Sequence, residues 1–213
     1  MRFTFTLWIA FSLLVLNSCI KHEVIPAPTS SVDLDCSFFG YINGTQIEYT
    51  QNVAGYNCYN ANQIFNNPSP TLSNVLYTSE ISSFQQSQKI RLTFGPQQWD
   101  AGVSSLPTLS MFNDFNSSNS GIQIPLKNIG DMTGATPGVQ IEYWDSYGDR
   151  WETSTADSPG FVTFTTLDQA SDNSGDYSIF QCAFNVTVYR EDPNQGLLSL
   201  TLNNCKFQGW FKR

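Results

Sequence analysis

Apolar and polar residues alternate along much of the chain, and this period of two predicts β-strands that bury one face. The alternation is clearest from Gln88 to Phe94, where Ile90, Leu92 and Phe94 are expected to face inward. Similar stretches predict strands over residues 72–78, 80–85, 139–144 and 160–166. We therefore predict an all-β fold, a single antiparallel β-sandwich or partly closed barrel of about eight to ten strands.

The first predicted hairpin turns at Asn43-Gly44. Both positions of such a two-residue turn need a positive φ, which Asn and Gly tolerate. The turn pairs Phe38 with Tyr49 and places Phe38 on the same face as Cys36. We expect that shared face to lie in the core.

One stretch has a longer period, because apolar residues recur every three positions at Leu106, Leu109, Phe112 and Phe115. This spacing predicts one short helix or 3₁₀ segment near 106–116, which covers one end of the sheet core. Beyond it, Pro125 cannot donate to a strand ladder, so residues 121–126 are expected to form an edge strand.

Polar segments predict the connections between strands. Residues 51–70 are rich in Asn and contain loops, and residues 130–138 form another loop. Residues 168–176 combine Asp, Asn, Ser and Gly, which are common in turns, and are expected to be a polar connection. Four of these residues also offer oxygen ligands for calcium, but their spacing is not that of an EF-hand: Asp168, Asp172, Asn173 and Asp176.

Two long strands close the chain. The inward phase of the last strand slips at Asn203-Asn204, which predicts a β-bulge. With the preceding loop centred on Pro193, Val188 faces Leu198, and Cys182 falls opposite Cys205 after the bulge. Facing residues lie about 4.5–5.5 Å apart, within the range of a disulfide. We therefore predict a Cys182–Cys205 bridge.

Another predicted hairpin turns at Tyr147-Gly148. Centring the turn there sets Trp144 opposite Trp151, with both on the face away from the apolar residues of strand 139–143. We hypothesise that Trp144, Tyr147 and Trp151 form an exposed ligand-binding patch that stacks on sugar rings or a partner protein. Alternatively, the tryptophans stabilise their own hairpin as a cross-strand pair or are covered by the loop at 130–138.

The amino-terminal segment has the pattern of a secretory signal: Arg2, an apolar run over residues 3–16, and then Ser18 before Cys19. It predicts a lipoprotein signal peptide over 1–18, acylation of Cys19, a flexible tether over 19–34 and a folded domain over 35–213. A conventional signal peptide ending near Ser18 is the alternative. A transmembrane helix needs about 20 apolar residues, more than this run provides. We expect a lipid-anchored body at the outer membrane, periplasmic or surface-exposed.

Composition narrows the chemistry. The chain has 10 basic and 18 acidic residues, and its net charge of −8 argues against a nucleic-acid partner. With one of its five cysteines lipidated, the remaining four predict two disulfides. Elimination leaves Cys36–Cys58 beside Cys182–Cys205, and a Cys36–Cys205 pair is the main alternative. No pair has C-x-x-C spacing and His22 is the only histidine, so neither a metal nor a cofactor is expected.

Several of these features occur together in one known group of proteins. A spacer after the acylated cysteine, an aromatic strand with an Asn-Gly turn, a strand Gly160-Phe-Val-Thr-Phe164 and a final strand ending Phe207-Gln-Gly-Trp-Phe211 resemble small β-rich lipoproteins of Bacteroidota that carry domains of unknown function. The likeness covers roughly residues 36–211. It departs from the usual pattern in its four mature cysteines and longer middle. It implies a location and a fold class but no reaction.

Catalytic signatures are scarce. The predicted domain has no histidine, which excludes a Ser–His–Asp triad. Glu142, Asp145, Asp149 and Glu152 cluster near the tryptophan hairpin, and a glycosidase needs two such acids. We expect a non-catalytic module that binds a glycan or an envelope partner, or that has a structural role. The alternative is a carbohydrate-active hydrolase that uses these acids.

Overall fold

The computed structural model describes residues 31–65, 73–154 and 160–213, and residues 31–213 form one compact unit. The predicted signal peptide, Cys19 and most of the predicted tether lie outside the described residues. No helix among the described residues has the length and apolar character needed to cross a membrane.

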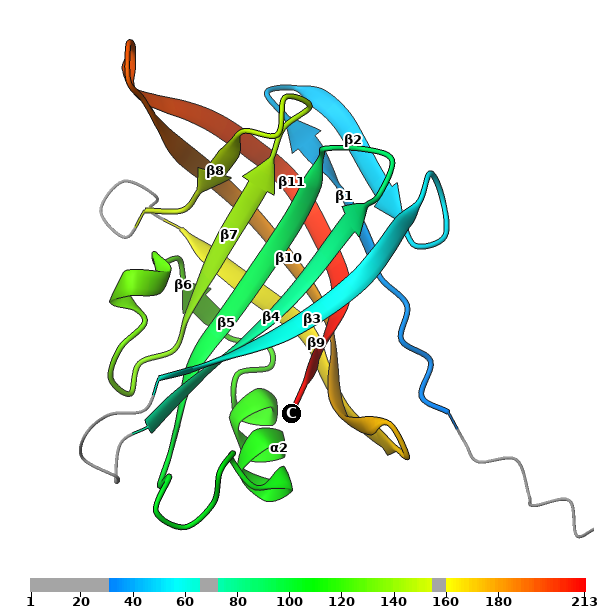
Figure 1. Cartoon of the computed structure of the whole chain (residues 1–213), viewed down its shortest axis with the longest axis vertical. Helices are drawn as coiled ribbons and strands as arrows, with labels where there is room; N and C mark the ends of the chain where they lie inside the picture. The colour runs from blue at the N-terminus through cyan, green and yellow to red at the C-terminus, as the bar shows by residue number, and fades with distance from the viewer. Residues whose placement is uncertain (1–30, 66–72, 155–159) are drawn as a thin grey trace, which may run out of the picture. The chain divides into compact units, whose positions relative to one another are not determined.

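The fold is all-β, as predicted, and consists of a single curled antiparallel sheet, a half-barrel (Figure 1). The sheet order is β2-β1-β11-β10-β8-β7-β5-β4-β3, with β9 paired to β10 and β6. The strands are β1 (Ser37–Ile42), β2 (Thr45–Thr50), β3 (Tyr56–Phe65), β4 (Ser73–Ser83), β5 (Lys89–Trp99), β6 (Gln123–Pro125), β7 (Gly138–Trp144), β8 (Arg150–Glu152), β9 (Phe161–Asp172), β10 (Gly175–Asp192) and β11 (Gly196–Lys212).

β2 and β3 are the two end strands of the sheet order, and the curl of the sheet brings them close together. Tyr49 on β2 stacks on Tyr56 of β3, with ring centroids 4.5 Å apart. Cys36, just before β1, forms a disulfide with Cys58 of β3. This confirms one predicted bridge and means that a covalent bond holds the curled sheet together at its seam.

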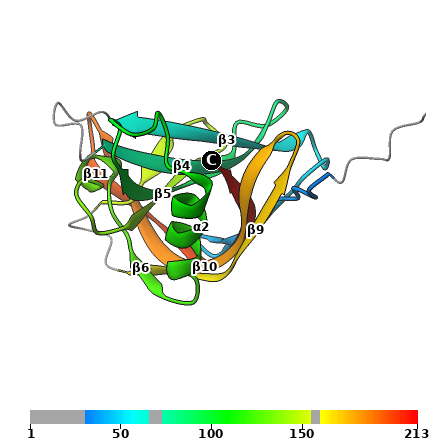
Figure 2. The same cartoon turned by 90° about the horizontal axis from the view of Figure 1, so that it is seen from below.

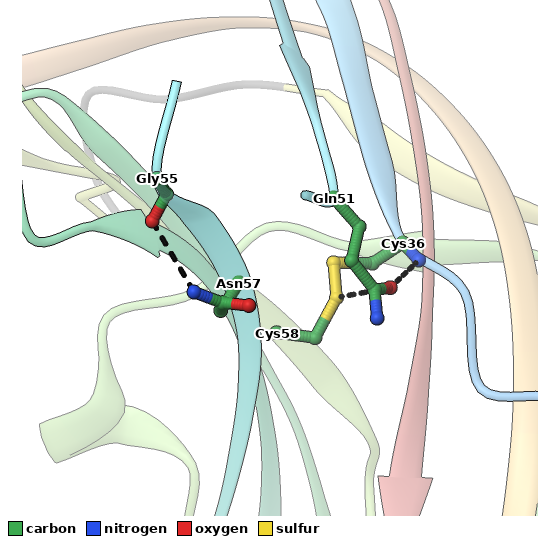
Figure 3. The surroundings of a disulfide bond; sticks show 5 residues. All are labelled: Cys36, Gln51, Gly55, Asn57 and Cys58. Carbon is green, nitrogen blue, oxygen red and sulfur yellow. Dashed lines mark hydrogen bonds between the residues drawn. A yellow bond between two sulfur atoms is a disulfide. The ribbon is translucent and has the colours of Figure 1, made fainter. Parts of the chain in front are cut away.

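Gln51, which follows β2, lies beside this disulfide (Figure 3). Its Oε1 accepts a hydrogen bond from the Cys36 N–H at 2.9 Å and lies 3.5 Å from the Cys58 Sγ. The Asn57 side chain donates to the Gly55 carbonyl at 3.3 Å. The start of the domain is therefore fixed to both edges of the sheet.

Aromatic side chains fill the interior of the half-barrel. Phe180 and Phe211 stack with centroids 4.6 Å apart, and Phe164 packs edge-on against Phe180 at 5.6 Å. All three are fully buried. The interior is thus a packed core, in which aromatic pairs add to the gain from burial.

One helix, α2 (Leu109–Ser118), confirms the helix predicted near 106–116. The Thr108 side chain caps it by accepting from the Met111 N–H. The buried Phe112 packs against Tyr77 at 5.1 Å, which places α2 across the lower opening of the sheet (Figure 2). A 3₁₀ turn, η2 (Ile129–Asp131), overlaps the start of the loop predicted at 130–138.

The first hairpin has the predicted register: Phe38 pairs with Tyr49 and Ile42 with Thr45. Cys36, Phe38 and Ile42 are buried, so the predicted core face is also confirmed. Short β6 pairs with β9, in agreement with an edge position for residues 121–126.

The register predicted for the last two strands is wrong. Val188 pairs with Leu200 rather than Leu198, because the turn is centred one residue later than Pro193. Asp192 sets this turn, since its carboxylate accepts from the N–H groups of Asn194 and Gln195. The predicted bulge is present.

The shifted register separates the two cysteines predicted to pair. Cys182 faces Phe207, and Cys205 faces Phe184. Both thiols are free and buried, so the Cys182–Cys205 bridge is not formed. Burial raises the pKa of both thiols, that of Cys205 to about 12.

Parts of two strands, β9 and β3, were predicted as loops because their residues are mostly polar. Residues 168–172, predicted as part of a connection, continue β9, and only 173–174 form the turn to β10. Residues 56–65, within the Asn-rich segment, form β3 and pair along their whole length with β4. In both cases, pairing with the neighbouring strand outweighs the low strand propensity of the polar side chains.

Candidate functional site

The tryptophan hairpin has a different register from the one predicted. Trp144 pairs with Arg150, and Trp151 pairs with Tyr143. The loop has three residues rather than two: the Asp145 N–H donates to the Asp149 carbonyl, and Gly148 has a φ of +83°. A glycine in this conformation is typical of three-residue hairpin loops. The extra residue turns Trp151 to the core face.

The three residues of the predicted patch therefore do not lie together. Trp151 is 8% exposed, and its indole N–H donates to Asp145 at 3.0 Å. Tyr147 is 89% exposed at the tip of the hairpin. Trp144 is half-buried on the outer face of the sheet. The predicted placement of both tryptophans on one outer face is wrong.

Cations lie over the Trp144 ring. The Lys89 Nζ is 4.1 Å and the Arg91 guanidinium carbon 4.9 Å from the ring centroid. In such contacts, the quadrupole of the aromatic ring attracts the cation electrostatically. Trp144 thus organises basic side chains on the outer face.

The acids near Trp144 belong to an ion-pair network that crosses β4, β5, β7 and β8. Arg91 contacts Glu80 at 2.6 Å and Glu142 at 3.5 Å. Arg150 contacts Glu142 and Glu152, both at 2.6 Å. These residues sit on neighbouring strands, so each cation lies between carboxylates.

The other predicted acids also have partners. The Asp145 carboxylate accepts from the Tyr147 and Asp149 N–H groups, and Asp149 pairs with Arg190. Asp176 pairs with Arg213 at 2.7 Å. The described part of the chain contains no group of three or more His, Cys, Asp or Glu residues that could hold a metal ion.

Asp172, one of the four residues considered for calcium, instead organises backbone. It accepts from the N–H groups of Val32, Ser174 and Gly175. These backbone donors hold the pKa of its carboxyl below the ordinary value. Its role is to close the β9–β10 turn.

A groove of about 420 Å³ lies on the outer face beside this network, and we call it the β3–β5 groove. It is lined by Tyr59, Asn60, Ala61, Asn62, Gln63, Thr78, Glu80 and Arg91. Tyr59 pairs across the ladder with Glu80, which pairs with Arg91, so the three strands present one continuous row. Tyr59 is 51% exposed. The groove combines the exposed Tyr59 ring with the Gln63 amide, a hydroxyl and an ion pair, whereas strand alternation places Asn60 and Asn62 on the other face of β3.

A second polar cluster lies inside the upper part of the half-barrel and consists of Tyr49, Tyr56 and Tyr143. The Tyr56 hydroxyl donates to the Gln88 carbonyl at 3.2 Å, and the Gln88 amide donates to the Tyr143 hydroxyl at 3.5 Å. Burial raises the pKa of all three hydroxyls. They are neutral structural groups at physiological pH.

No protein-family model, curated protein or solved structure matches the chain. Sequence reasoning missed the β3–β5 groove because Tyr59 lies in the Asn-rich segment expected to contain loops. The alternation of Tyr56 and Cys58 inward with Tyr59 outward was the available signal.

Proposed function

We propose that the protein is an exported, lipid-anchored module that binds a neutral glycan in the β3–β5 groove. The observation that carries this proposal is the half-exposed ring of Tyr59 on the wall of a groove that also carries the Gln63 amide and the Thr78 hydroxyl. A flat aromatic face can stack on the apolar face of a sugar, and its hydroxyl remains free to bond at the edge. Amide groups both donate and accept, which suits sugar hydroxyls.

The charges beside the groove favour an uncharged ligand. Arg91 is the cation of the groove lining, and it is held by Glu80 and Glu142. Recruiting its guanidinium to an anionic sugar would weaken these pairs and leave the nearly buried Glu142 carboxylate less well compensated. A neutral oligosaccharide can accept a hydrogen bond from the Arg91 edge while the pairs persist.

The same contacts favour binding over hydrolysis. A glycosidase needs two carboxylates that face the scissile bond, one of them as an acid with a raised pKa. Glu142 and Glu152 are both held by Arg150, and Asp149 is held by Arg190. The hydrolase alternative would have to break these pairs, so we retain the non-catalytic assignment.

The proposed location rests on the amino-terminal sequence. Arg2, the apolar run and Cys19 support export and acylation, and several acyl chains hold a protein firmly at a membrane. A body held in this way presents its groove to envelope or extracellular glycans. Its glycan specificity would then be tuned by the Gln63 amide beside Tyr59.

A glycan array probed with the mature lipidated chain in detergent tests the proposal. We expect neutral oligosaccharides to bind, and Tyr59→Ala to lower affinity about tenfold or more, since loss of one ring–ligand contact of about 1.4 kcal/mol corresponds to that factor. Tyr147→Ala is the matched control, because it removes a more exposed tyrosine outside the groove.

Three outcomes would overturn the proposal. They are no binding to any neutral glycan, equal losses from Tyr59→Ala and Tyr147→Ala, or a preference for acidic glycans. Circular dichroism of both variants establishes that a loss of binding is not a loss of fold.

A further inference from the structure

β3 ends the sheet and is paired along one edge only (Figure 1). It pairs with β4 along its whole length, and no strand in the described part of the chain pairs with its other edge. At the start of β3, the Cys36–Cys58 disulfide brings the opposite end of the sheet close to that edge. Residues 59–65 lie beyond this closure, and we call their unpaired side the β3 edge. An edge of this kind presents backbone N–H and C=O groups that another strand can bind.

The β3 edge lacks the features that usually prevent pairing with another chain. Charged side chains, prolines, bulges and short length are the common protections of edge strands. Residues 59–65 contain neither a charged residue nor a proline, and their register with β4 has no shift. In contrast, β2 has six residues and carries Glu48, β6 contains Pro125, and β9 carries Asp168. The β3 edge is therefore open to a further strand.

Apolar side chains at the end of β3 are exposed on both faces of the sheet. Ile64 is 43% and Phe65 41% exposed, and strand alternation directs them to opposite faces. A strand added at the β3 edge would cover part of both side chains. Burial of apolar surface would thus add to the backbone hydrogen bonds of such a pairing.

We propose that a second copy of this chain binds at the β3 edge, so that two β3 strands pair antiparallel in a two-fold dimer. Two antiparallel copies of one strand are self-complementary, because each contact is repeated with the roles of the copies exchanged. The net charge of −8 opposes association of two copies, and the uncharged β3 edge lets them meet without facing charges. This inference rests on neither the glycan binding nor the lipid attachment proposed above.

The symmetry fixes which residues face each other. If all seven residues of the β3 edge pair, Asn62 lies on the two-fold axis opposite its own copy, and Tyr59 lies opposite Phe65. Facing residues of an antiparallel pair have Cα atoms about 4.5–5.5 Å apart, within the range that a disulfide accepts. A cysteine at position 62 should therefore form a disulfide with its own copy.

Oxidative cross-linking of the mature Asn62→Cys protein tests this pairing. Gln46→Cys is the matched control, because both native residues are exposed and polar and lie on the two end strands of the sheet. Cys182 and Cys205 are buried and do not compete. We expect the linked dimer, identified by its intact mass, to form about tenfold faster at position 62 than at position 46, since pairing raises the local thiol concentration.

Adding Ile64→Lys to the Asn62→Cys protein places a charge on the β3 edge and is expected to slow cross-linking to the rate of the control. Circular dichroism of each variant establishes that the fold is retained. Equal rates at positions 62 and 46, an unmodified protein that stays monomeric in native mass spectrometry, or a cross-link to a different envelope protein would overturn the proposal. A monomer that still binds neutral glycans would leave the proposed function standing, so the two failures are distinguishable.

Discussion

Glu142 is an acid that the fold buries on the outer face of the sheet. Its side chain is 4% exposed, whereas those of its partners Arg91 and Arg150 are 33% and 47% exposed. Taking a carboxylate out of water is costly unless charge and hydrogen bonds compensate it. Arg91 and Arg150 provide that compensation from β5 and from the start of β8, so Glu142 links three strands.

Glu142→Gln is expected to lower the free energy of unfolding by about 2 kcal/mol, since breaking a buried pair is costly but both arginines remain partly solvated. Urea denaturation measures this change. Glu152→Gln is the matched control, because the Glu152 side chain is 35% exposed and pairs with the same Arg150. Its expected cost is below about 1 kcal/mol. Equal costs for the two variants would contradict the role given to Glu142.

The cluster of Tyr49, Tyr56 and Tyr143 predicts a loss of stability at high pH. Burial raises their folded-state pKa above the value of about 10 in the unfolded chain. Above pH 10 these tyrosines ionise in the unfolded state but stay protonated in the folded state, so the unfolded state binds fewer protons than the folded state. Each group then lowers the free energy of unfolding by up to about 1.4 kcal/mol per pH unit. Below pH 10 this contribution is fully present.

Urea unfolding between pH 8 and pH 11 tests this dependence. We expect Tyr49→Phe to reduce the slope of stability against pH above pH 10, because one of the tyrosines whose pKa is raised in the folded state is removed. A slope that the substitution leaves unchanged would show that other groups cause the alkaline loss.

At the scale of elements, the Cys36–Cys58 disulfide joins the residue before β1, beside the end strand β2, to β3 at the other end of the sheet path. It spans a sequence separation of 22, so the chain-entropy relation gives a stabilisation of about 3 kcal/mol. We expect Cys36→Ser/Cys58→Ser to lower the free energy of unfolding by roughly that amount. Urea denaturation measures it.

The matched control for the disulfide is a reducing agent added to the same two proteins. Reduction should destabilise the wild type to the level of the double variant and leave the double variant unchanged. A wild-type midpoint insensitive to reduction would contradict the assigned contribution of the bridge.

The elements differ in how far the sequence determined them. The Asn43-Gly44 turn fixed its hairpin register because the turn length follows from two adjacent residues that tolerate positive φ. The predicted centre of the β7–β8 turn was wrong by half a residue, and that of the β10–β11 turn by one residue. The length of each turn is set by an aspartate, Asp145 or Asp192, whose carboxylate accepts hydrogen bonds from backbone N–H groups of the turn. In a ladder, a turn moved by half a residue changes the face of every side chain on the returning strand.

Whole-molecule features were harder to predict. Alternation along each strand indicated a sheet with one buried face, but did not indicate that β2 and β3 meet as the ends of one curled sheet. The candidate site depends on that arrangement, because Tyr59, Glu80 and Arg91 become one row only when β3, β4 and β5 are neighbours. Such long-range pairing is not encoded in local periodicity.

Hydrogen–deuterium exchange of the mature lipidated protein, with and without saturating neutral oligosaccharide from the array, tests whether a glycan binds in the β3–β5 groove. We expect slower exchange in peptides from β3 (Tyr56–Phe65) and β4 (Ser73–Ser83), and unchanged exchange in the β7–β8 hairpin around Tyr147. Protection centred on that hairpin, or no protection in β3, would contradict it.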